Sequence, residues 1–405
     1  MKIGFVSTWL ERGATYVTKT YMSLLDDHEL YVYARGGEKY ERNNPKFAND
    51  FVTWGLRLGS TKIDWKHFSY WIKENQLDAI LFNEQTDLIC VLKTKKYFPK
   101  IKIGAYIDYY TEGTVDEYKV YDFLICNTKR HYSVFEWHKG AYYVPWGTNL
   151  DIFEYDEKPK NNSEIKFFHS MGMSGRKGTN SLVKAFINGK FYEKNAKLII
   201  HSQVNIEHII KKEEAQRYNI EIVIKEVPPP GLYHLGDVYV YPTILEGLGL
   251  TIYEALACGL PVITTDNPPM NEVVNEKNGR LVDVELLRAR KDGYYWPSAF
   301  VNEQSLINSM NYYCDNRKEL NKFKKDARDF AEFNHNIMDR KEDINKIFEK
   351  APLQEHSIIN IDKWIKKEQN KQKNLNKRTV LEILLPNKIK HVIRANLEEK
   401  RFGSN

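Results

Sequence analysis

Short apolar runs alternate with stretches of helical spacing over the first 150 residues. The chain opens with an apolar run at 2–7, a glycine-containing turn at 11–15 and a helical pattern at 16–25. Further strand-length runs lie at 30–33, 79–82, 101–106 and 123–126, and helical patterns lie at 63–75 and 86–96. This alternation predicts a parallel sheet with helices on both faces.

A second series with the same alternation follows the polar stretch 154–164. Its expected strands are 165–169, 197–201, 220–224, 238–241 and 261–264, and its helices include 180–187 and 250–257. The predicted fold class is therefore α/β, with two Rossmann-like domains joined by a linker near 150–162. Such domains bind ligands at the carboxyl ends of their strands, in a cleft between the two sheets.

The pattern changes after residue 302. Residues 303–349 predict helices rich in Lys, Asp and Asn. Farther on, a basic amphipathic segment has Ile389, Val392, Ile393 and Leu397 on one helical face. A basic amphipathic segment can lie on an anionic membrane surface, although docking on the protein's own body or on a partner helix is the reading we rank first.

Composition and charge narrow the function classes. The chain has 405 residues, 42% of them hydrophobic, but it contains no run of 18 apolar residues that would span a membrane. The first residues lack a basic start before an apolar stretch, so we expect no secretory signal and a cytoplasmic protein. The four cysteines have neither metal-ligand nor redox spacing, which predicts reduced thiols and no metal site.

The net charge of +6 is concentrated at one end of the chain. Residues 356–405 contain twelve Lys and Arg against five Asp and Glu, whereas the other residues contain forty-eight against forty-nine. A nucleic-acid surface would need basic groups clustered on the body, so we expect no nucleic-acid partner. Peripheral contact with a membrane through the basic tail is kept as the alternative to docking on the protein's own body or on a partner helix.

The densest candidate chemistry lies at 241–263. A β-rich segment ends near Thr243, a loop with two glycines follows, and a helix then runs to Gly259. Such a loop lets backbone N–H groups approach an anion, and the helix dipole adds about half a positive charge. We expect a phosphate or diphosphate there, bound by Gly247, Leu248, Gly249, Leu250 and Thr251.

Two carboxylates flank this anion site. Glu246 precedes the glycines, and Glu254 lies about one turn into the helix. Carboxylates accept hydrogen bonds from hydroxyls, which suits Glu254 for a ribose and Glu246 for a sugar beyond the phosphates. Two glutamates at this spacing also arise by chance, so the prediction depends on the loop, the helix and the strand 261–264 together.

A second glycine-rich turn follows the strand 165–169. It carries Arg176 and Lys177 and leads into a helix. Basic groups at this place can neutralise a leaving diphosphate, on which charge develops in the transition state. The alternative reading is an ordinary solvated turn.

These motifs resemble those of the retaining glycosyltransferases of family 4, over residues 1 to about 350. Glu246 and Glu254 match the paired glutamates of the family, residues 247–250 match its phosphate loop, and Lys177 matches its diphosphate lysine. Gly13 is similar to the glycine of the first loop, which approaches the donor from the other domain. The resemblance implies the two-Rossmann GT-B fold, with an acceptor domain at 1–155 and a donor domain at 156–335. A helix at 336–355 would return to the first domain, before a basic helical tail at 356–405.

The sequence departs from the family pattern at two places. The family has an arginine soon after the glycine that corresponds to Gly172, where this chain has Met173, and Arg176 is the candidate substitute. The family also has a histidine where this chain has Ile107. Asp108 or Tyr109 would then contact the sugar hydroxyls, or activity would be lost.

The resemblance implies transfer of a sugar from a nucleotide-diphosphate sugar, with UDP favoured over GDP, and with retention through a same-face mechanism. Glu246, Lys177 and Asp108 are the expected catalytic residues, and no metal or other cofactor is expected. The acceptor would be a glycan, a glycoconjugate or a lipid-linked molecule. Tyr109 and Tyr110 are candidate acceptor contacts at the cleft edge, although aromatic clusters are more often core. We interpret the isolated histidines as core or surface residues: His131, His138, His201 and His234.

Two alternatives stay open at this point. One is a catalytically silent GT-B subunit that binds a sugar or a partner, with Ile107 as its main support. The other is a sugar-nucleotide epimerase. A nicotinamide oxidoreductase is disfavoured, because no G-x-G-x-x-G follows the first strand.

Overall fold

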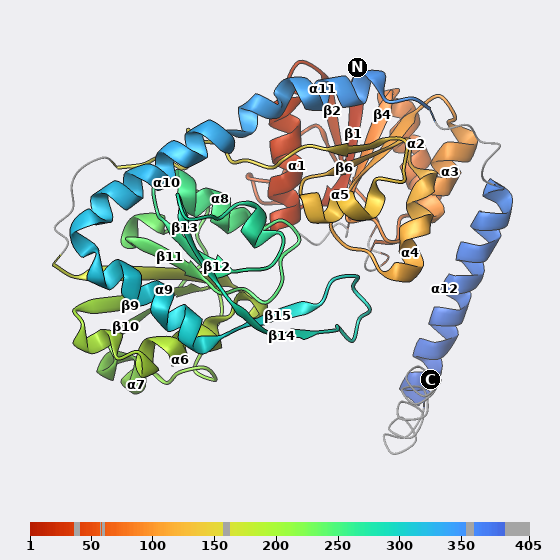
Figure 1. Cartoon of the computed structure of the whole chain (residues 1–405). Helices are drawn as coiled ribbons and strands as arrows, with labels where there is room; N and C mark the ends of the chain where they lie inside the picture. The colour runs from red at the N-terminus through yellow and green to blue at the C-terminus, as the bar shows by residue number, and fades with distance from the viewer. Residues whose placement is uncertain (36–40, 57, 59–60, 157–162, 354–359, 385–405) are drawn as a thin grey trace.

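Two α/β lobes form the molecule in the computed structural model (Figure 1). The structure describes residues 1–35, 41–56, 58, 61–156, 163–353 and 360–384, with side chains up to residue 373. The amphipathic segment that contains Ile389 to Leu397 lies outside these residues.

The first lobe contains a parallel sheet with the strand order β3-β2-β1-β4-β5-β6-β7. Its strands are β1 (Lys2–Thr8), β2 (Glu29–Arg35), β3 (Val52–Trp54), β4 (Ala79–Asn83), β5 (Lys102–Tyr106), β6 (Phe123–Cys126) and β7 (Ala141–Tyr143). Its helices are α1 (Gly13–Leu24), α2 (Trp65–Asn75), α3 (Ile89–Tyr97), α4 (Glu112–Val115) and α5 (Lys129–Phe135). The central strands are apolar on both faces because helices cover both sides of a parallel sheet.

The second lobe contains a parallel sheet with the order β10-β9-β8-β11-β12-β13. Its strands are β8 (Ile165–Gly172), β9 (Ala196–Ser202), β10 (Ile220–Ile224), β11 (Val238–Tyr241), β12 (Val262–Thr265) and β13 (Gly279–Val282). Its helices are α6 (Thr179–Asn188), α7 (Lys212–Arg217), α8 (Leu250–Ala257), α9 (Glu303–Asp315) and α10 (Leu320–Asn334). An antiparallel hairpin of β14 (Val284–Arg288) and β15 (Ser298–Val301) extends from it.

The predicted α/β class with two parallel sheets is confirmed. The helix expected at 86–96 begins instead at Ile89 and continues to Tyr97, and the Asp87 carboxylate accepts the Ile89 N–H at 3.0 Å just before it. The sequence did not predict β3, β7 and β13, which are short strands at or near the sheet edges. It also did not predict the β14–β15 hairpin.

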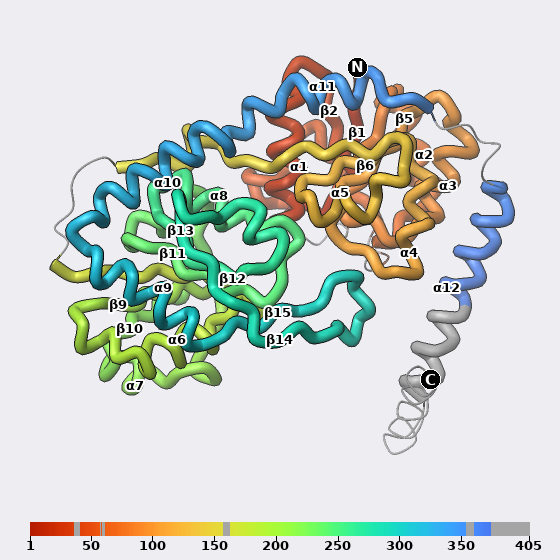
Figure 2. Tube along the Cα trace, in the orientation of Figure 1, coloured from red at the N-terminus to blue at the C-terminus, as the bar shows by residue number. Residues whose placement is uncertain are grey.

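The chain returns to the first lobe after α10 (Figure 2). A short 3-10 helix, η7 (Ile337–Arg340), leads into α11 (Lys341–Lys350), which packs beside α1. The Phe348 ring lies 5.1 Å from that of Phe123, and Lys102 Nζ donates to the Phe348 carbonyl at 3.0 Å. The last described helix, α12 (Ile361–Leu384), packs against α3. No helix in the described part of the chain is both long and apolar enough to cross a membrane.

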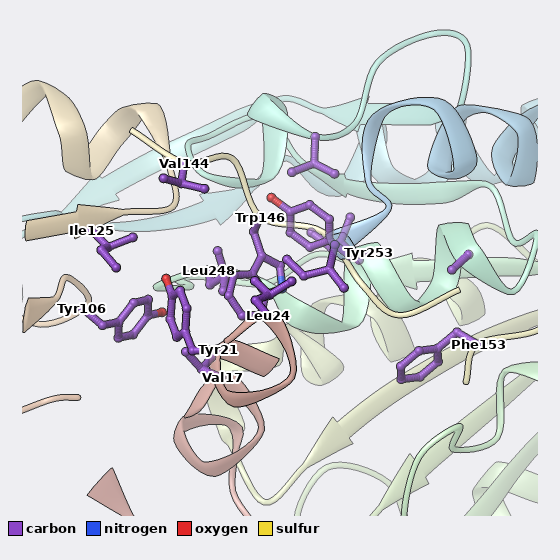
Figure 3. Close-up of a cluster of buried hydrophobic side chains, with 14 of the residues drawn as sticks. Val17, Tyr21, Leu24, Tyr106, Ile125, Val144, Trp146, Phe153, Leu248 and Tyr253 are labelled. Atoms are coloured by element: carbon purple, nitrogen blue, oxygen red, sulfur yellow. The ribbon is translucent and has the colours of Figure 1, made fainter. Parts of the chain in front are cut away.

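Apolar side chains from both lobes form one buried cluster (Figure 3). Trp146 lies 5.8 Å from Tyr21 of α1, ring to ring, and the cluster continues to Leu248 and Tyr253 of the second lobe. Burial of this apolar surface favours the association of the lobes, which sets the glycine loop against the first lobe.

The two segments that cross between the lobes are bonded to each other. Thr148 N–H donates to the His335 carbonyl at 2.8 Å, and Ile337 N–H donates to the Thr148 carbonyl at 3.1 Å. Beside them, a Cβ at Gly147 would clash with the His335 backbone. Gly147 therefore lets two backbones approach closely.

We predict that Gly147→Ala destabilises the protein by about 2 kcal/mol, because neither backbone can move away freely. Gly113→Ala is the matched control, since nothing lies within 4 Å of its Cβ position. Urea denaturation should show a lower midpoint for Gly147→Ala and an unchanged or slightly higher one for Gly113→Ala, since alanine is favoured over glycine within a helix. Equal midpoints for both variants would contradict this close approach of the two backbones.

Candidate functional site

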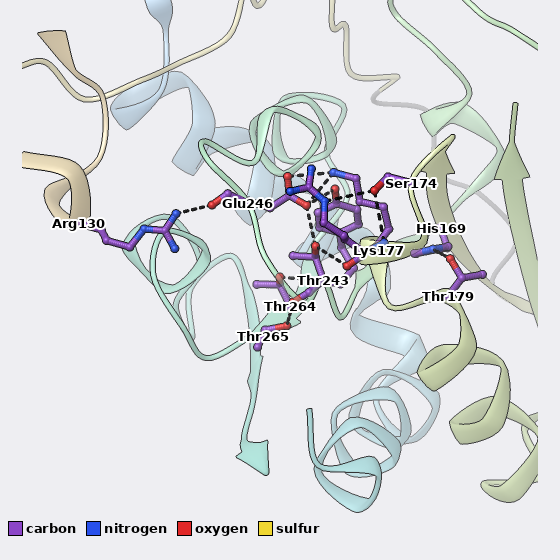
Figure 4. A network of polar contacts seen from close by, with 11 residues as sticks. Arg130, His169, Ser174, Lys177, Thr179, Thr243, Glu246, Thr264 and Thr265 are labelled. Atoms are coloured by element: carbon purple, nitrogen blue, oxygen red, sulfur yellow. Dashed lines mark hydrogen bonds and ion pairs between the residues drawn. The ribbon is translucent and has the colours of Figure 1, made fainter. Parts of the chain in front are cut away.

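An ion pair between the half-buried Lys177 and the buried Glu246 lies at the carboxyl end of β11 (Figure 4). Lys177 Nζ donates to both carboxylate oxygens of Glu246, at 2.7 and 2.9 Å. Glu246 Oε1 also accepts the hydroxyls of Thr243, at 2.6 Å, and Tyr241, at 2.8 Å. The two expected catalytic residues of this lobe are thus in direct contact.

The position of Lys177 follows from a tight turn, the 3-10 helix η2 (Gly175–Lys177). Ile244 N–H donates to the Arg176 carbonyl at 2.8 Å, which attaches this turn to the end of β11. Gly178 has a φ of +76°, and a Cβ there would clash with the Pro242 carbonyl. Glycine is needed for both reasons, and it lets Lys177 reach Glu246.

Glu246 is 7% exposed and carries its charge in this environment. Burial alone would raise the pKa of its carboxyl group, but the Lys177 charge and the hydrogen bonds from Lys177, Thr243 and Tyr241 together lower that pKa. The carboxylate is therefore an oriented acceptor for hydroxyl groups.

A buried histidine supports the turn that carries Lys177. His169, at 0% exposure, contacts the Val240 carbonyl through Nδ1 at 2.7 Å and the Thr179 hydroxyl through Nε2 at 2.9 Å. Burial lowers its pKa to about 4, so the imidazole is neutral at physiological pH. It fixes the start of α6 behind Lys177.

Two helices of different lobes begin close together. Gly249, with a φ of +80°, precedes α8, and no side chain caps that helix start. Gly13 begins α1, which also has no side-chain cap, and its Cβ position lies 3.5 Å from Leu250 Cδ1. Uncapped N–H groups and two positive dipole ends therefore lie near each other, an arrangement that favours an anion.

The remaining predicted donor residues lie around this point. Leu248 is buried in the cluster between the lobes, so only its backbone can serve a ligand. Thr251 lies half-buried in the first turn of α8, and Arg176 is exposed beside Lys177. Glu254 is half-buried farther along α8, where it accepts the Tyr233 hydroxyl at 2.6 Å. Burial raises the pKa of Glu254, although the Tyr233 hydrogen bond opposes this effect.

Asp108 reaches the glycine loop from the first lobe. A Cβ at Gly247 would clash with its carboxylate, so the absence of a side chain at Gly247 allows the contact. Burial and the nearby Glu84 raise the pKa of Asp108 to about 7, against the opposing charges of Arg130 and Arg176. Ile107, in contrast, is fully buried in the first-lobe core and presents no polar group to the site.

The start of α5 contributes two residues that the sequence analysis missed. Arg130 donates to the Glu246 carbonyl and to the Pro268 carbonyl. His131 Nε2 lies 3.0 Å from the Gly247 carbonyl, and burial lowers the pKa of its ring to about 3. Our interpretation of His131 as a core or surface residue identified its burial but not this contact. The sequence signal was Thr128, whose hydroxyl caps α5 directly after β6.

Glu272 of the second lobe completes this contact. Its carboxylate accepts the N–H groups of Lys129 and Arg130, at 2.6 and 2.9 Å, at the amino end of α5. A negative side chain at a helix amino end is favourable because of the helix dipole. The glycine loop and α5 are therefore held together from both lobes.

The β14–β15 hairpin spans the same boundary on another side. Tyr294 OH donates to the Asp108 carbonyl at 3.1 Å, and Tyr295 N–H donates to the Tyr110 carbonyl at 3.0 Å. Trp296 Nε1 donates to Tyr110 OH at 2.7 Å, and that hydroxyl lies 2.8 Å from His131 Nδ1. A chain of hydrogen bonds thus runs from the hairpin through the first lobe to Gly247.

The two acceptor candidates differ in their surroundings. Tyr110 is 1% exposed and serves the hydrogen-bond chain, so its ring does not face an open surface. Tyr109 is 37% exposed and stacks on Tyr294, with ring centroids 5.2 Å apart. Tyr109 is the better placed of the two to contact a ligand.

Residues 151–330 match the family model for glycosyl transferases group 1. The capsular polysaccharide biosynthesis glycosyltransferase CapM of Staphylococcus aureus is 29% identical over 192 residues, which are 44% of this chain and 49% of CapM. The O-antigen chain mannosyltransferase B of Escherichia coli is 43% identical over 47 residues, or 12% of each chain. The chain thus spans half or less of the length of these curated relatives.

Solved structures share the fold over most of the chain. The Anabaena protein HepE, crystallised with UDP and glucose, has a TM-score of 0.66 and 14% identity over 86% of this chain and 99% of its own. The pneumococcal O-GlcNAc transferase GtfA, crystallised with UDP and GlcNAc, has a TM-score of 0.63 and 12% identity over 87% and 99%. The expected GT-B fold is confirmed.

We predict that Lys177→Met lowers the free energy of unfolding by about 3 kcal/mol at pH 7, because it leaves a buried charge unpaired. In the wild type the lowered pKa of Glu246 stabilises the fold above the ordinary pKa of a glutamate, and this contribution is lost as the pH falls through the folded pKa. In the variant burial raises that pKa, so the difference between the proteins should shrink towards pH 4. Urea denaturation across this range measures it.

The double variant Lys177→Met/Glu246→Gln serves as the control and should recover most of the loss at pH 7. A loss that is equal at every pH would show that Lys177 acts through packing alone.

We also predict that Tyr294→Phe/Trp296→Phe, which keeps an aromatic ring at both positions, loosens the hairpin. Two hydrogen bonds between the lobes disappear, so exchange of the Tyr295 amide hydrogen should accelerate about tenfold or more. Leu287→Ala, at a side chain 56% exposed on the hairpin stem, should leave that exchange unchanged. Hydrogen–deuterium exchange read by mass spectrometry distinguishes these outcomes, and unchanged exchange in the double variant would contradict the bridging role.

Proposed function

Because residues 151–330 form a domain of the group 1 glycosyl transferases, we propose that the chain transfers a sugar from a nucleotide-diphosphate sugar to a glycan, glycoconjugate or lipid-linked acceptor. The observation that carries this proposal is the charged, buried Glu246 on Lys177, directly before the uncapped start of α8. Relatives named for capsular polysaccharide and O-antigen synthesis support a role in glycan assembly. A cytoplasmic location stays a prediction from the sequence.

We propose UDP rather than GDP as the carrier. HepE and GtfA, which share the fold, were both crystallised with UDP. The diphosphate would bind the N–H groups of Gly249 and Leu250 and the cationic groups of Arg176 and Lys177. Glu254 would accept hydrogen bonds from the ribose, and Gly13 would let the start of α1 approach from the other lobe.

Glu246 and Asp108 would orient the transferred sugar. Both carboxyl groups adjoin the glycine loop, one from each lobe, and Glu246 already accepts two hydroxyl hydrogen bonds there. Lys177 has three ammonium hydrogens, so it can keep its bonds to Glu246 and donate to a phosphate oxygen as well.

The proposed reaction retains the anomeric configuration. The bond from the anomeric carbon to the diphosphate oxygen breaks, and the acceptor oxygen forms its bond on the same face. The acceptor proton passes to the leaving diphosphate, whose negative charge Lys177, Arg176 and the start of α8 stabilise. We propose that no metal is needed, because these protein groups supply the positive charge.

The proposal is tested first by thermal shift with UDP, GDP and ADP, and then by assaying their sugars for hydrolysis and transfer. UDP should raise the melting temperature most, since the tighter ligand stabilises more at equal concentration. Lys177→Ala should lower kcat/KM by about a hundredfold or more. Lys184→Ala, at an exposed lysine of α6, should leave turnover unchanged.

Near-normal turnover of Lys177→Ala would contradict the proposed role of Lys177. Binding of UDP without hydrolysis or transfer of any donor would favour a silent subunit instead. Release of an epimerised sugar without an acceptor would favour an epimerase.

A further inference from the structure

Helix α12 is fixed on the first lobe by its inner face. Ile361, Trp364 and Ile365 pack against the apolar core around α3. Asp362 accepts from Lys96 at 2.6 Å, and Lys371 lies 3.4 Å from Glu117. The orientation of the described part of this helix relative to the lobe is therefore set by specific contacts.

The outer face of α12 presents a stripe of lysines. Lys363, Lys366, Lys367 and Lys373 fall within about 120° of each other around the helix, opposite the packed face. All four are exposed, and the structure gives their ammonium groups no ion pair with any described residue. Asp362, at the edge of the stripe, is neutralised by Lys96.

Two exposed tyrosines lie on the neighbouring helices of the same flank. Tyr97 of α3 is 57% exposed and packs beside Trp65, and Tyr70 of α2 is 63% exposed. Helix α2 packs on α3, and α3 packs on α12. Figure 1 shows that these helices lie on the side of the first lobe away from the second lobe. Aromatic rings with a polar tip favour the boundary between water and lipid.

We propose that this flank, formed by α2, α3 and the lysine stripe of α12, docks on an anionic phospholipid surface. Lysines on a fixed helix face match the lipid phosphates, and tyrosines beside them can enter the headgroup layer. Outside residues 356–405 the numbers of acidic and basic residues differ by only one, so the rest of the chain has almost no net charge. The attraction to anionic lipid would therefore come from this flank and not from the protein as a whole. The proposal is independent of turnover, because binding to a membrane needs no donor or acceptor.

A soluble polyanion is the competing partner, since it would also attract lysines. The tyrosines favour the membrane, because a soluble polyanion gives no reason for uncharged rings on the same flank. Binding to a membrane should therefore depend on Tyr70 and Tyr97, whereas binding to a soluble polyanion should not.

Sedimentation of the full chain with lipid vesicles tests the proposal. One set of vesicles contains phosphatidylcholine alone, and the other contains about one third phosphatidylglycerol. The wild type should bind only the anionic vesicles, and less at high salt. Replacing Lys363, Lys366, Lys367 and Lys373 by Gln should weaken binding at least ~30-fold, because each lysine near such a surface contributes severalfold.

The matched control makes the same charge change on the second lobe. Lys184, Lys225, Lys277 and Lys322 are exposed there, and replacing them by Gln should leave vesicle binding nearly unchanged. Tyr70→Ser/Tyr97→Ser should weaken the binding that remains at high salt. Circular dichroism and the melting temperature check that each variant is folded.

Three results would overturn the proposal. The first is full binding by the α12 variant, and the second is an equal loss in the control variant. The third combines two observations: inorganic polyphosphate binds the wild type more tightly than the anionic vesicles do, and the tyrosine variant binds as the wild type does. That result would assign the lysine stripe to a soluble polyanion.

Discussion

A carboxylate that stays charged inside the protein is the constraint on which the site depends. Glu246 keeps its charge because Lys177 and two hydroxyls surround it, and each of these groups needs its own support. The Gly178 turn brings Lys177 into reach, and β11 supplies Tyr241. Removing any one of these supports would leave the buried carboxylate with too few partners. The stability of the fold would then fall, because burying an ion without partners is unfavourable.

The backbone of the same loop depends on the other lobe. From the first lobe, Arg130 donates to the Glu246 carbonyl, and His131 is hydrogen-bonded to the Gly247 carbonyl. From the second lobe, the Glu272 carboxylate caps the amino end of α5. One lobe thus fixes the side chain of Glu246 while the other fixes its main chain. The geometry of the site therefore depends on both lobes packed together, and neither lobe alone provides it.

The sequence predicted the parts of this arrangement that are local in the chain. The alternation of strands and helices gave both sheets, and the glycines between Glu246 and Glu254 marked the start of α8. Arg130, His131 and the β14–β15 hairpin were missed because their partners lie in the other lobe. No pattern within 284–301 indicates that Tyr294 will meet Asp108, since that contact exists only after the lobes associate. Tyr110 was expected at the cleft edge; it lies at the boundary between the lobes, where Trp296 covers its hydroxyl, and this contact too exists only after the lobes associate.

The return of α11 to the first lobe limits how lobes can be exchanged between related proteins. The first lobe consists of two separated stretches of chain, and the second lobe is an insert between them. A fragment that stopped near residue 150 would leave the surface beneath Phe348 open to water. Grafting a second lobe from a relative onto this chain would therefore need both crossing segments to be matched at once, so that recombination must replace an internal block rather than an end.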